Sequence, residues 1–345
     1  MQNSKSALPW DPLELAEAAR RHLTAGTATY IETTAVFPPT NDNEVAWSQW
    51  RFVPHVARDV STVSTEIELF GKRNCAPILL APCAFTGHAH TAGELAVARA
   101  AVETGTTYVV SQTSSKRPSD VARSAPGSCW LQIYVPADEG ELLAALAEAA
   151  DAGFGAVVVT VDAPVGSIRY QGYVPDRDFV DPMQRARPNG SPLNPAVTWK
   201  TIERIVERTS LPVLVKGVLR ADDARAAVLH GAAGVIVSNH GARQLDGVVP
   251  TAAVLEKIAA VADPVPVLVD GGIRTGRDVL RALCLGARAV LIGRPYLWAL
   301  AISGAGGVQE LLLRFRLELE NALALTGCAS PADAARDLLV RWSAE

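Results

Sequence analysis

From residue 76 onward, short apolar segments alternate with amphipathic segments along the chain. The apolar segments are rich in Val, Ile and Leu throughout, which is typical of parallel strands that are covered on both faces. They lie at 76–82, 107–112, 129–135, 156–162, 212–218, 234–241, 266–272 and 289–295. A segment with helical periodicity follows each of them, so the pattern predicts eight strand–helix units.

Eight successive strand–helix units predict a closed (β/α)8 barrel of the TIM type. An open doubly wound sheet is the alternative, but the turn after the first strand lacks the GxGxxG pattern that such a sheet uses for dinucleotides. We therefore expect three regions. They are an N-terminal helical and irregular extension at 1–75 that packs on the barrel, the barrel itself at 76–330, and a C-terminal tail at 331–345.

Three segments outside the strand–helix units have recognisable patterns. Residues 11–23 predict a short amphipathic helix with Asp11 or Pro12 at its start. The sequence STEIELFG at 64–71 predicts one strand of a hairpin. The segment 165–197, after the fourth barrel strand, is rich in Gly, Pro, Arg and Asp, and at the mouth of a barrel such a loop is expected to act as a lid.

Composition narrows the classes of protein that fit. Of the 345 residues, 49% are hydrophobic and 20% charged, which excludes a disordered chain. The net charge of −4 argues against a nucleic-acid partner. We expect no membrane span and no signal peptide, because no apolar run approaches about 18 residues and the N-terminus has no apolar core. Five scattered cysteines without a CxxC pair fit a reducing compartment, so we expect a cytoplasmic protein without a zinc site.

Polar residues gather at the predicted carboxyl ends of the strands, where barrels build their active sites. They are Ser111, Gln132, Tyr134, Thr160, Asp162, Lys216, Ser238, Asn239, His240, Asp270 and Arg294. Lys216 lies in the apolar segment PVLVKGV, and a buried lysine needs either an anionic partner or a lowered pKa. It is therefore a structural ion pair, a cation held against an electron-rich group, or a Schiff-base amine.

The last two units predict a phosphate site. The motifs VDGGIRTGRD and LIGRP follow the seventh and eighth strands, whose loops bind phosphate in many barrels. The candidate ligands are Gly271, Gly272, Arg274, Gly293 and Arg294. The alternative is a pair of ordinary tight turns with surface arginines.

His240, in SNHGARQLDG, is the candidate general base because its side chain titrates near neutral pH. We expect Asp162 to share its face and to orient the imidazole, and Arg243 to hold a carboxylate nearby. His88 and His90 have no carboxylate or cysteine at metal-ligand spacing, so they predict loop structure and no metal site.

Several of these segments together resemble the FMN-dependent 2-hydroxy-acid oxidase and dehydrogenase family, which includes glycolate, lactate and mandelate oxidases. The matching segments are VSNHGARQLDG, VDGGIRTGRDVLRALCLGARAVLIGRP, LPVLVKGV, LQIYV, TVDAP and LAPCAF, and the likeness extends over about residues 10–330. The resemblance implies an FMN cofactor, a small-molecule substrate and assembly into a homotetramer.

The resemblance also implies which residues bind FMN. The ring would lie near Ala81, Cys83, Ala84, Ser111, Gln132 and Thr160, and Ser238 would help to hold it. Lys216 would face the N1/O2 edge and stabilise the anionic reduced ring, while Asp270 would bind the ribityl chain. The phosphate would be bound by Gly272, Arg274, Gly293 and Arg294.

A mechanism follows from the same resemblance. His240 would take a proton from the α-hydroxyl or the α-carbon of the substrate, and electrons would pass to flavin N5. Arg169 and Arg243 would clamp the substrate carboxylate, a task that suits the planar guanidinium. Tyr134 would hydrogen-bond the hydroxyl or the developing carbonyl, and Asp162 would stabilise the charged imidazole.

The chain departs from the family pattern at three places. The family has a tyrosine in its N-terminal helix that reaches the carboxylate, and alignment on Gly26 puts His22 there. Thr113 stands where glycolate oxidase-like members carry Trp, and the acidic residue that follows Arg169 in the family is missing. These changes predict a larger pocket and a bulkier substrate, such as an aryl 2-hydroxy acid or a secondary-metabolite intermediate.

Three other functions fit part of the pattern, and one of them is an oxidoreductase that acts on a diverged substrate other than a 2-hydroxy acid. A non-oxidising FMN barrel, resembling type 2 isopentenyl diphosphate isomerase, would share the phosphate site but would not need Arg169, Arg243 and His240 together. A flavin-binding scaffold without activity would not need His240, Asp162 and Lys216. Whether oxygen or another carrier accepts the electrons stays open, although the lack of a haem-binding extension favours an oxidase.

Overall fold

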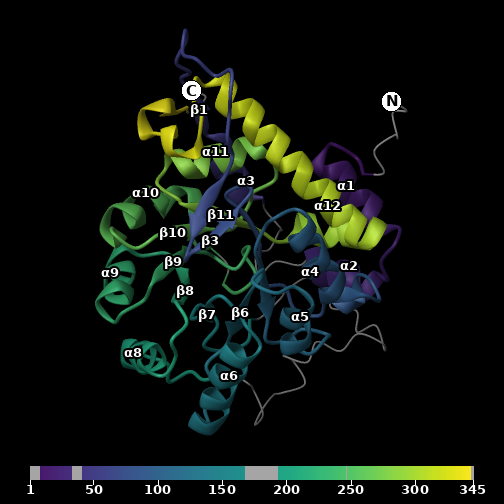
Figure 1. Ribbon diagram of the computed structural model, residues 1–345, viewed down its shortest axis with the longest axis vertical. Helices are drawn as coiled ribbons and strands as arrows, with labels where there is room; N and C mark the ends of the chain where they lie inside the picture. The colour runs from purple at the N-terminus through teal and green to yellow at the C-terminus, as the bar shows by residue number, and fades with distance from the viewer. Residues whose placement is uncertain (1–7, 33–40, 168–192, 246, 343–345) are drawn as a thin grey trace.

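The computed structural model describes residues 8–32, 41–167, 193–245 and 247–342. A closed barrel of eight parallel strands forms its centre, as the strand pattern predicts (Figure 1). The strands are β4 (Ile78–Leu80), β5 (Tyr108–Ser111), β6 (Cys129–Ile133), β7 (Val157–Thr160), β8 (Val213–Val218), β9 (Gly234–Val237), β10 (Val267–Val269) and β11 (Ala289–Ile292). Each lies within one predicted segment, and β11 pairs with β4 to close the ring.

Helices surround the barrel and cover the outer faces of its strands (Figure 1). They are α4 (Gly93–Glu103), α5 (Pro118–Ser124), α6 (Glu139–Asp151), α8 (Trp199–Glu207), α9 (Ala221–Leu229), α10 (Thr251–Ala262), α11 (Gly276–Cys284) and α12 (Arg294–Leu325), with a short 3-10 turn η1 (Thr86–His88) before α4. The predicted lid at 165–197 lies largely outside the described residues.

The last helix, α12, begins directly after β11 and extends over 32 residues. It is kinked at Ser303 and Gly304, and Gly304 has a φ of 57° that favours glycine. By length and composition α12 is the one described helix that could cross a membrane, but 61% of its apolar window is buried. It packs against α4 and α11, as a core helix of a barrel does.

The interior of the barrel is filled with side chains. Alternate strand residues, among them Leu79, Val158 and Leu268, form one buried cluster inside the ring. The hairpin of β2 (Ile67–Leu69) and β3 (Lys72–Asn74), of which the sequence predicts one strand, buries its apolar side chains in this same cluster. Because side chains fill the interior, a polar site can form only at the open end of the barrel.

The N-terminal extension contains more helix than its sequence predicts. The predicted helix is confirmed as α1 (Pro12–Arg20), in which the Asp11 side chain accepts hydrogen bonds from the first helical N–H groups. Two further helices, α2 (Ala25–Glu32) and α3 (Asp42–Ser48), were not predicted. α1 packs on α12, and α3 packs on α10 (Figure 1).

The extension and the C-terminal tail meet in a small sheet that the sequence does not predict. β1 (Trp50–Phe52) pairs antiparallel with β12 (Leu339–Arg341), which follows two 3-10 turns, η2 (Pro331–Asp333) and η3 (Arg336–Leu338). A strand of three residues is too short to show a periodicity of its own.

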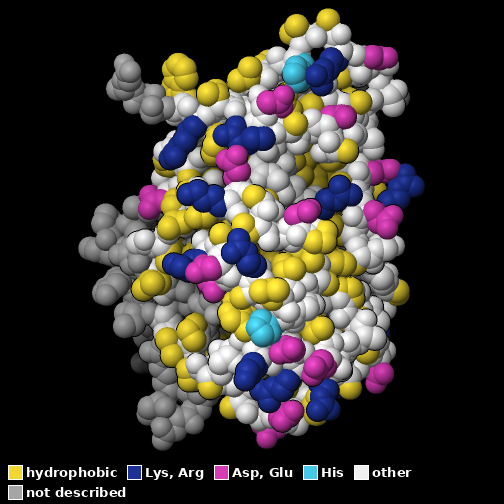
Figure 2. Space-filling view, turned by 90° about the vertical axis from the view of Figure 1, so that its left-hand side faces the viewer, with side chains coloured by type: hydrophobic (Ala, Val, Ile, Leu, Met, Phe, Trp, Pro, Cys, Tyr) yellow, Lys and Arg dark blue, Asp and Glu magenta, His cyan; other side chains and the backbone are white. Residues whose placement is uncertain are grey.

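On the face of the molecule in Figure 2, Lys and Arg side chains are interspersed with Asp and Glu side chains.

Candidate active site

A single cavity at the carboxyl ends of the barrel strands brings most of the predicted site residues together. Its lining includes Ala81, Cys83, Ala84, Ser111, Gln132, Tyr134, Thr160, Lys216, His240, Arg243, Asp270, Gly271, Gly272, Arg274, Gly293 and Arg294. These residues come from eight different strand ends, and parallel strands in a closed ring end at one rim. The closed barrel therefore brings residues that are far apart in the sequence together on one polar surface.

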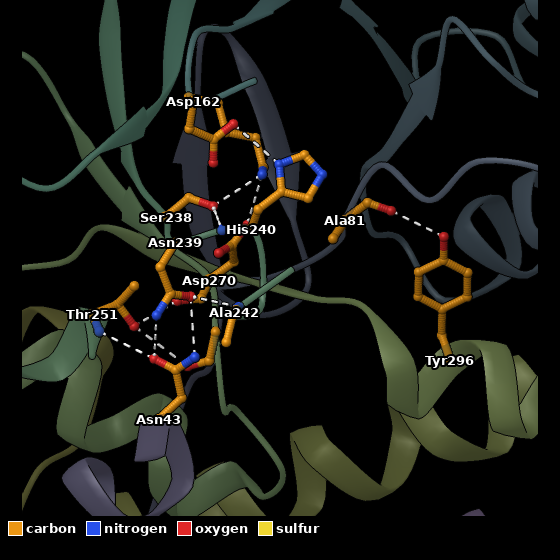
Figure 3. A network of polar contacts seen from close by, with 12 residues as sticks. Asn43, Ala81, Asp162, Ser238, Asn239, His240, Ala242, Thr251, Asp270 and Tyr296 are labelled. Atoms are coloured by element: carbon orange, nitrogen blue, oxygen red, sulfur yellow. Dashed lines mark hydrogen bonds and ion pairs between the residues drawn. The ribbon is translucent and has the colours of Figure 1, made fainter. Parts of the chain in front are cut away.

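His240 and Asp162 lie in direct contact, as the sequence predicts. Nδ1 of His240 lies 3.0 Å from Oδ1 of Asp162 (Figure 3). Burial alone would raise the pKa of Asp162, but His240 and Lys216 hold that pKa below its ordinary value. An ionised Asp162 accepts a hydrogen bond from the Nδ1–H group, so the neutral imidazole carries its lone pair on Nε2.

The backbone at His240 turns sharply. His240 has a φ of 56° and Ala242 a φ of 61°, with Gly241 between them at 66°. Left-handed conformations are uncommon for residues other than glycine, and they persist where surrounding contacts impose them. Here the Ser238 hydroxyl oxygen accepts from the His240 N–H at 3.0 Å, and the Asn239 carbonyl accepts from the Ala242 N–H at 2.9 Å.

Lys216 has the anionic partner that its burial requires. Its Nζ lies 3.1 Å from Oδ2 of Asp270 and donates to the Ser238 hydroxyl oxygen at 3.0 Å. Burial would lower the pKa of Lys216, but Asp270 and Asp162 raise it above its ordinary value. Lys216 is therefore a permanent cation, which disfavours the Schiff-base alternative because that chemistry needs a neutral amine.

Three arginines concentrate positive charge at one end of the cavity. Arg294 donates to the Gly241 carbonyl at 2.5 Å, and Arg274 lies 2.7 Å from a carboxylate oxygen of Glu44. Burial, together with the nearby Arg274 and Arg243, lowers the pKa of Arg294 to about 9. A buried cation that other cations disfavour is stabilised when an anion binds beside it, so this end of the cavity is suited to a phosphate.

Two buried polar atoms of the lining have no hydrogen-bond partner among the described residues. They are Nε2 of Gln132, a donor, and Oδ1 of Asp270, an acceptor. Buried polar groups in native proteins are normally satisfied, so these two atoms point to a polar ligand with both acceptor and donor groups. The same wall carries Thr113, whose Oγ1 lies 3.0 Å from the Ser111 hydroxyl oxygen.

The structure corrects the assignment of His22. His22 is exposed in the turn after α1 and is not among the cavity-lining residues, so the prediction that it takes the place of the family's tyrosine is wrong. Tyr30 of α2 lines the cavity instead, with its ring centroid 5.0 Å from the guanidinium carbon of Arg243. Alignment on Gly26 placed the tyrosine before that glycine, whereas it lies four residues after it, one helical turn further along α2.

Two other predicted residues stand apart from the lining. Ser238 is fully buried behind the cavity wall, where its hydroxyl contacts Lys216 and His240, so its position differs from the expected contact with the ring. Arg169 lies outside the described residues. Among the described residues no cluster could hold a metal ion, and His90 accepts from the Ala92 N–H within its loop.

The sequence did not point to α3 as part of the site. Asn43 and Glu44 line the cavity beside the phosphate candidates, and the Trp47 indole N–H donates to the Gly271 carbonyl at 2.8 Å. These residues lie about 200 positions before the loops that they contact. No periodicity or motif spacing in the extension signals a contact over that separation.

Comparison with known proteins agrees with this geometry. A family model described as FMN-dependent dehydrogenase matches residues 19–341. The 4-hydroxymandelate oxidase of Amycolatopsis orientalis is 41% identical over 85% of this chain and 87% of its own length. Human 2-hydroxyacid oxidase 1 is 38% identical over 83% and 84%. A mandelate oxidase variant solved with benzoyl-formic acid superposes with a TM-score of 0.85 at 38% identity, covering 96% of this chain and 99% of that one.

Proposed function

The chain belongs to the FMN-dependent dehydrogenase family of 2-hydroxy-acid oxidases, and from this membership we propose that it oxidises an aryl 2-hydroxy acid to the 2-oxo acid, with His240 as the general base. The observation that carries the proposal is the contact of 3.0 Å between His240 and Asp162 in a cavity that also holds the Lys216–Asp270 pair. This arrangement combines a base, its orienting carboxylate and a fixed cation in one place.

The cavity residues fit FMN at both of its ends. Arg274 and Arg294 would bind the phosphate, which supplies the anion that their burial calls for. Oδ1 of Asp270 would accept from a ribityl hydroxyl, and Nε2 of Gln132 would donate to a ring carbonyl, so both unpartnered atoms gain a partner. When bound, FMN supplies the two-electron acceptor, through N5 of its ring.

His240 performs the proton chemistry in this proposal. Its Nε2 removes a proton from the substrate as the C2–H bond is oxidised and the hydroxyl becomes a carbonyl, leaving an imidazolium. Asp162 stabilises that imidazolium through the Nδ1–H hydrogen bond, as its lowered pKa equips it to do. Tyr134, which lines the same cavity, would hydrogen-bond the reacting oxygen.

Recognition of the substrate carboxylate is assigned to Arg243 and Tyr30. Both line the cavity, and the guanidinium of Arg243 lies over the Tyr30 ring, which fixes the two groups relative to each other. Arg243 also donates to the Ile31 carbonyl at 3.1 Å, which ties it to α2. A guanidinium and a phenol together provide hydrogen-bond donors for a carboxylate.

We expect Tyr30→Phe to raise KM about tenfold for a 2-hydroxy acid with a smaller change in kcat, because one hydrogen bond to a charged group is lost. Steady-state kinetics of the FMN-loaded enzyme measure this effect. His22→Ala is the matched control, and its KM is expected to equal that of the wild type since His22 is exposed and outside the lining. A raised KM in the His22 variant alone would show that His22, and not Tyr30, contacts the substrate carboxylate.

Substrate size is assigned from the cavity wall and the relatives. Thr113 is a small side chain in the lining, and two of the compared relatives are named for 4-hydroxymandelate and mandelate. We expect mandelate-type acids to bleach the bound flavin at least about tenfold faster than glycolate or L-lactate in anaerobic stopped flow, since even one extra methylene in a hydrophobic pocket is worth about 1–3 kcal/mol. Fast bleaching by glycolate contradicts the assignment. A separate measurement, re-oxidation of the bleached enzyme in air, tests whether oxygen is the electron acceptor.

A further inference from the structure

Two buried asparagines form a reciprocal amide pair beneath the active site (Figure 3). Nδ2 of Asn43 donates to Oδ1 of Asn239 at 3.0 Å, and Nδ2 of Asn239 donates back to Oδ1 of Asn43 at 2.9 Å. Asn43 is 8% exposed and Asn239 is 5% exposed. The pair joins α3 of the N-terminal extension to the residue that directly precedes His240.

Every polar atom of the two amides is used. Oδ1 of Asn43 also accepts from the Thr251 N–H at 3.2 Å, and Nδ2 of Asn239 also donates to the Val249 carbonyl at 3.3 Å. Oδ1 of Asn239 accepts from the Ala242 N–H at 3.3 Å, within the left-handed turn. Removal of either amide therefore leaves buried donors and acceptors of the other without partners.

The pair also contacts the glycines of the predicted phosphate loop. A Cβ on Gly272 would meet the Cβ and backbone carbon of Asn43 at 2.7 Å, and a Cβ on Gly271 would meet Oδ1 of Asn239 at 3.1 Å. The amides thus lie directly against this loop, and side chains on either glycine would displace them. α3 is held there independently by the Trp47 indole and by the Glu44–Arg274 ion pair.

We propose that Asn43 is a positioning residue for the reaction: through Asn239 it holds the left-handed turn at 240–242 that directs the His240 imidazole toward Asp162 and the cavity. The inference rests on the proposed role of His240 as the base. The N-terminal extension would then contribute to catalysis indirectly, because Asn43 acts through Asn239 and does not touch the reacting atoms. Both polar atoms of the Asn239 side chain bond to Asn43, so the position of that side chain depends on α3.

A double-mutant cycle tests whether Asn43 acts through Asn239. We expect Asn43→Ala and Asn239→Ala each to slow substrate-driven bleaching of the FMN-loaded enzyme about 10–100-fold, the effect of a small misplacement of a reacting group. The double variant is expected to be about as slow as the slower single variant, since both changes break one interaction. Effects that multiply, or a wild-type rate in folded, FMN-loaded Asn43→Ala, overturn the inference.

Ser48→Ala is the matched control on the same helix. Its hydroxyl is exposed and donates to the Val45 carbonyl at 2.8 Å, away from the pair, so its bleaching rate is expected to equal that of the wild type. If Asn43→Ala does not fold, Asn43→Asp takes its place. That variant keeps the shape of the side chain but cannot donate to Oδ1 of Asn239, so the same loss of rate is expected.

A second readout does not depend on substrate. In protein labelled with ¹⁵N-histidine, the His240 Nδ1 proton that is bound to Asp162 is expected to give a downfield proton resonance. This resonance should move or be lost by exchange in the Asn43 variant and stay unchanged in Ser48→Ala, and an unmoved resonance in a folded Asn43 variant contradicts the inference. If no 2-hydroxy acid bleaches the wild type, the proposed function fails, while this resonance still decides the role of Asn43.

Discussion

Replacement of His240 by alanine is expected to leave FMN bound and to slow substrate-driven bleaching by at least about 10²–10⁴-fold. His240 supplies the only imidazole among the described lining residues, and its Nδ1 is already engaged with Asp162. Without it, no described imidazole lines the cavity to accept the substrate proton. Anaerobic stopped flow at the visible flavin band, with a saturating mandelate-type acid, measures the loss directly.

His22→Ala serves again as the control, because it removes an imidazole of the same chemistry from an exposed position. The flavin content and the melting temperature of the His240 variant should stay close to those of the wild type, since the imidazole is only partly buried. A variant that bleaches at the wild-type rate would remove His240 from the role of base. A variant that has lost FMN would instead indicate that the turn at 240–242 had collapsed.

Replacement of Lys216 by methionine is expected to produce the largest loss of stability of any single change in the site. The methionine fills the volume but leaves the buried Asp270 carboxylate without its cation, and breaking a buried ion pair in this way costs about 3–5 kcal/mol. Lys216 has a raised pKa, so its contribution is complete below its ordinary pKa of 10.5 and is lost only as pH rises through the higher value in the folded state. The loss of stability should therefore be present throughout the neutral range.

Urea unfolding of the variant and the wild type, at several pH values, measures this difference. Lys257→Met removes an exposed lysine of α10 and is expected to change the free energy of unfolding by less than about 0.5 kcal/mol. In the Lys216 variant that still binds FMN, the flavin midpoint potential should fall, because negative charge on the reduced ring is no longer balanced. An unchanged potential would show that Lys216 does not face the ring.

The strand-end residues of the site could be predicted because their positions depend on local pattern. Asp270 and His240 each follow a segment that is apolar enough to be a buried parallel strand, and Lys216 lies within such a segment. Once eight such strands close into a ring, their carboxyl ends must share one rim, whatever the lengths of the helices between them. The pairing of His240 with Asp162, and of a buried lysine with an anion, then follows from the cost of leaving buried charges unpaired.

The contributions of the N-terminal extension could not be predicted in this way. Tyr30 was missed because α2 has no strong polar and apolar alternation, so nothing fixed which of its residues faces the barrel. Asn43 meets Asn239 across 196 positions of sequence, and a single asparagine has no pattern. The pairing of β1 with β12 joins the N-terminal extension to the C-terminal tail, and neither strand is long enough for its sequence to indicate a partner.

The sequence by itself determined the barrel, the rim at which the candidate site lies, and the candidate base with its charged neighbours. Only the tertiary structure decided which tyrosine reaches the cavity, how the extension lies across its mouth, and which amide steadies the turn at the base. The reason is physical. The periodicity of a strand or helix reflects which of its residues are buried. Contacts between a peripheral helix and a distant loop depend instead on how the folded surfaces of both elements fit together.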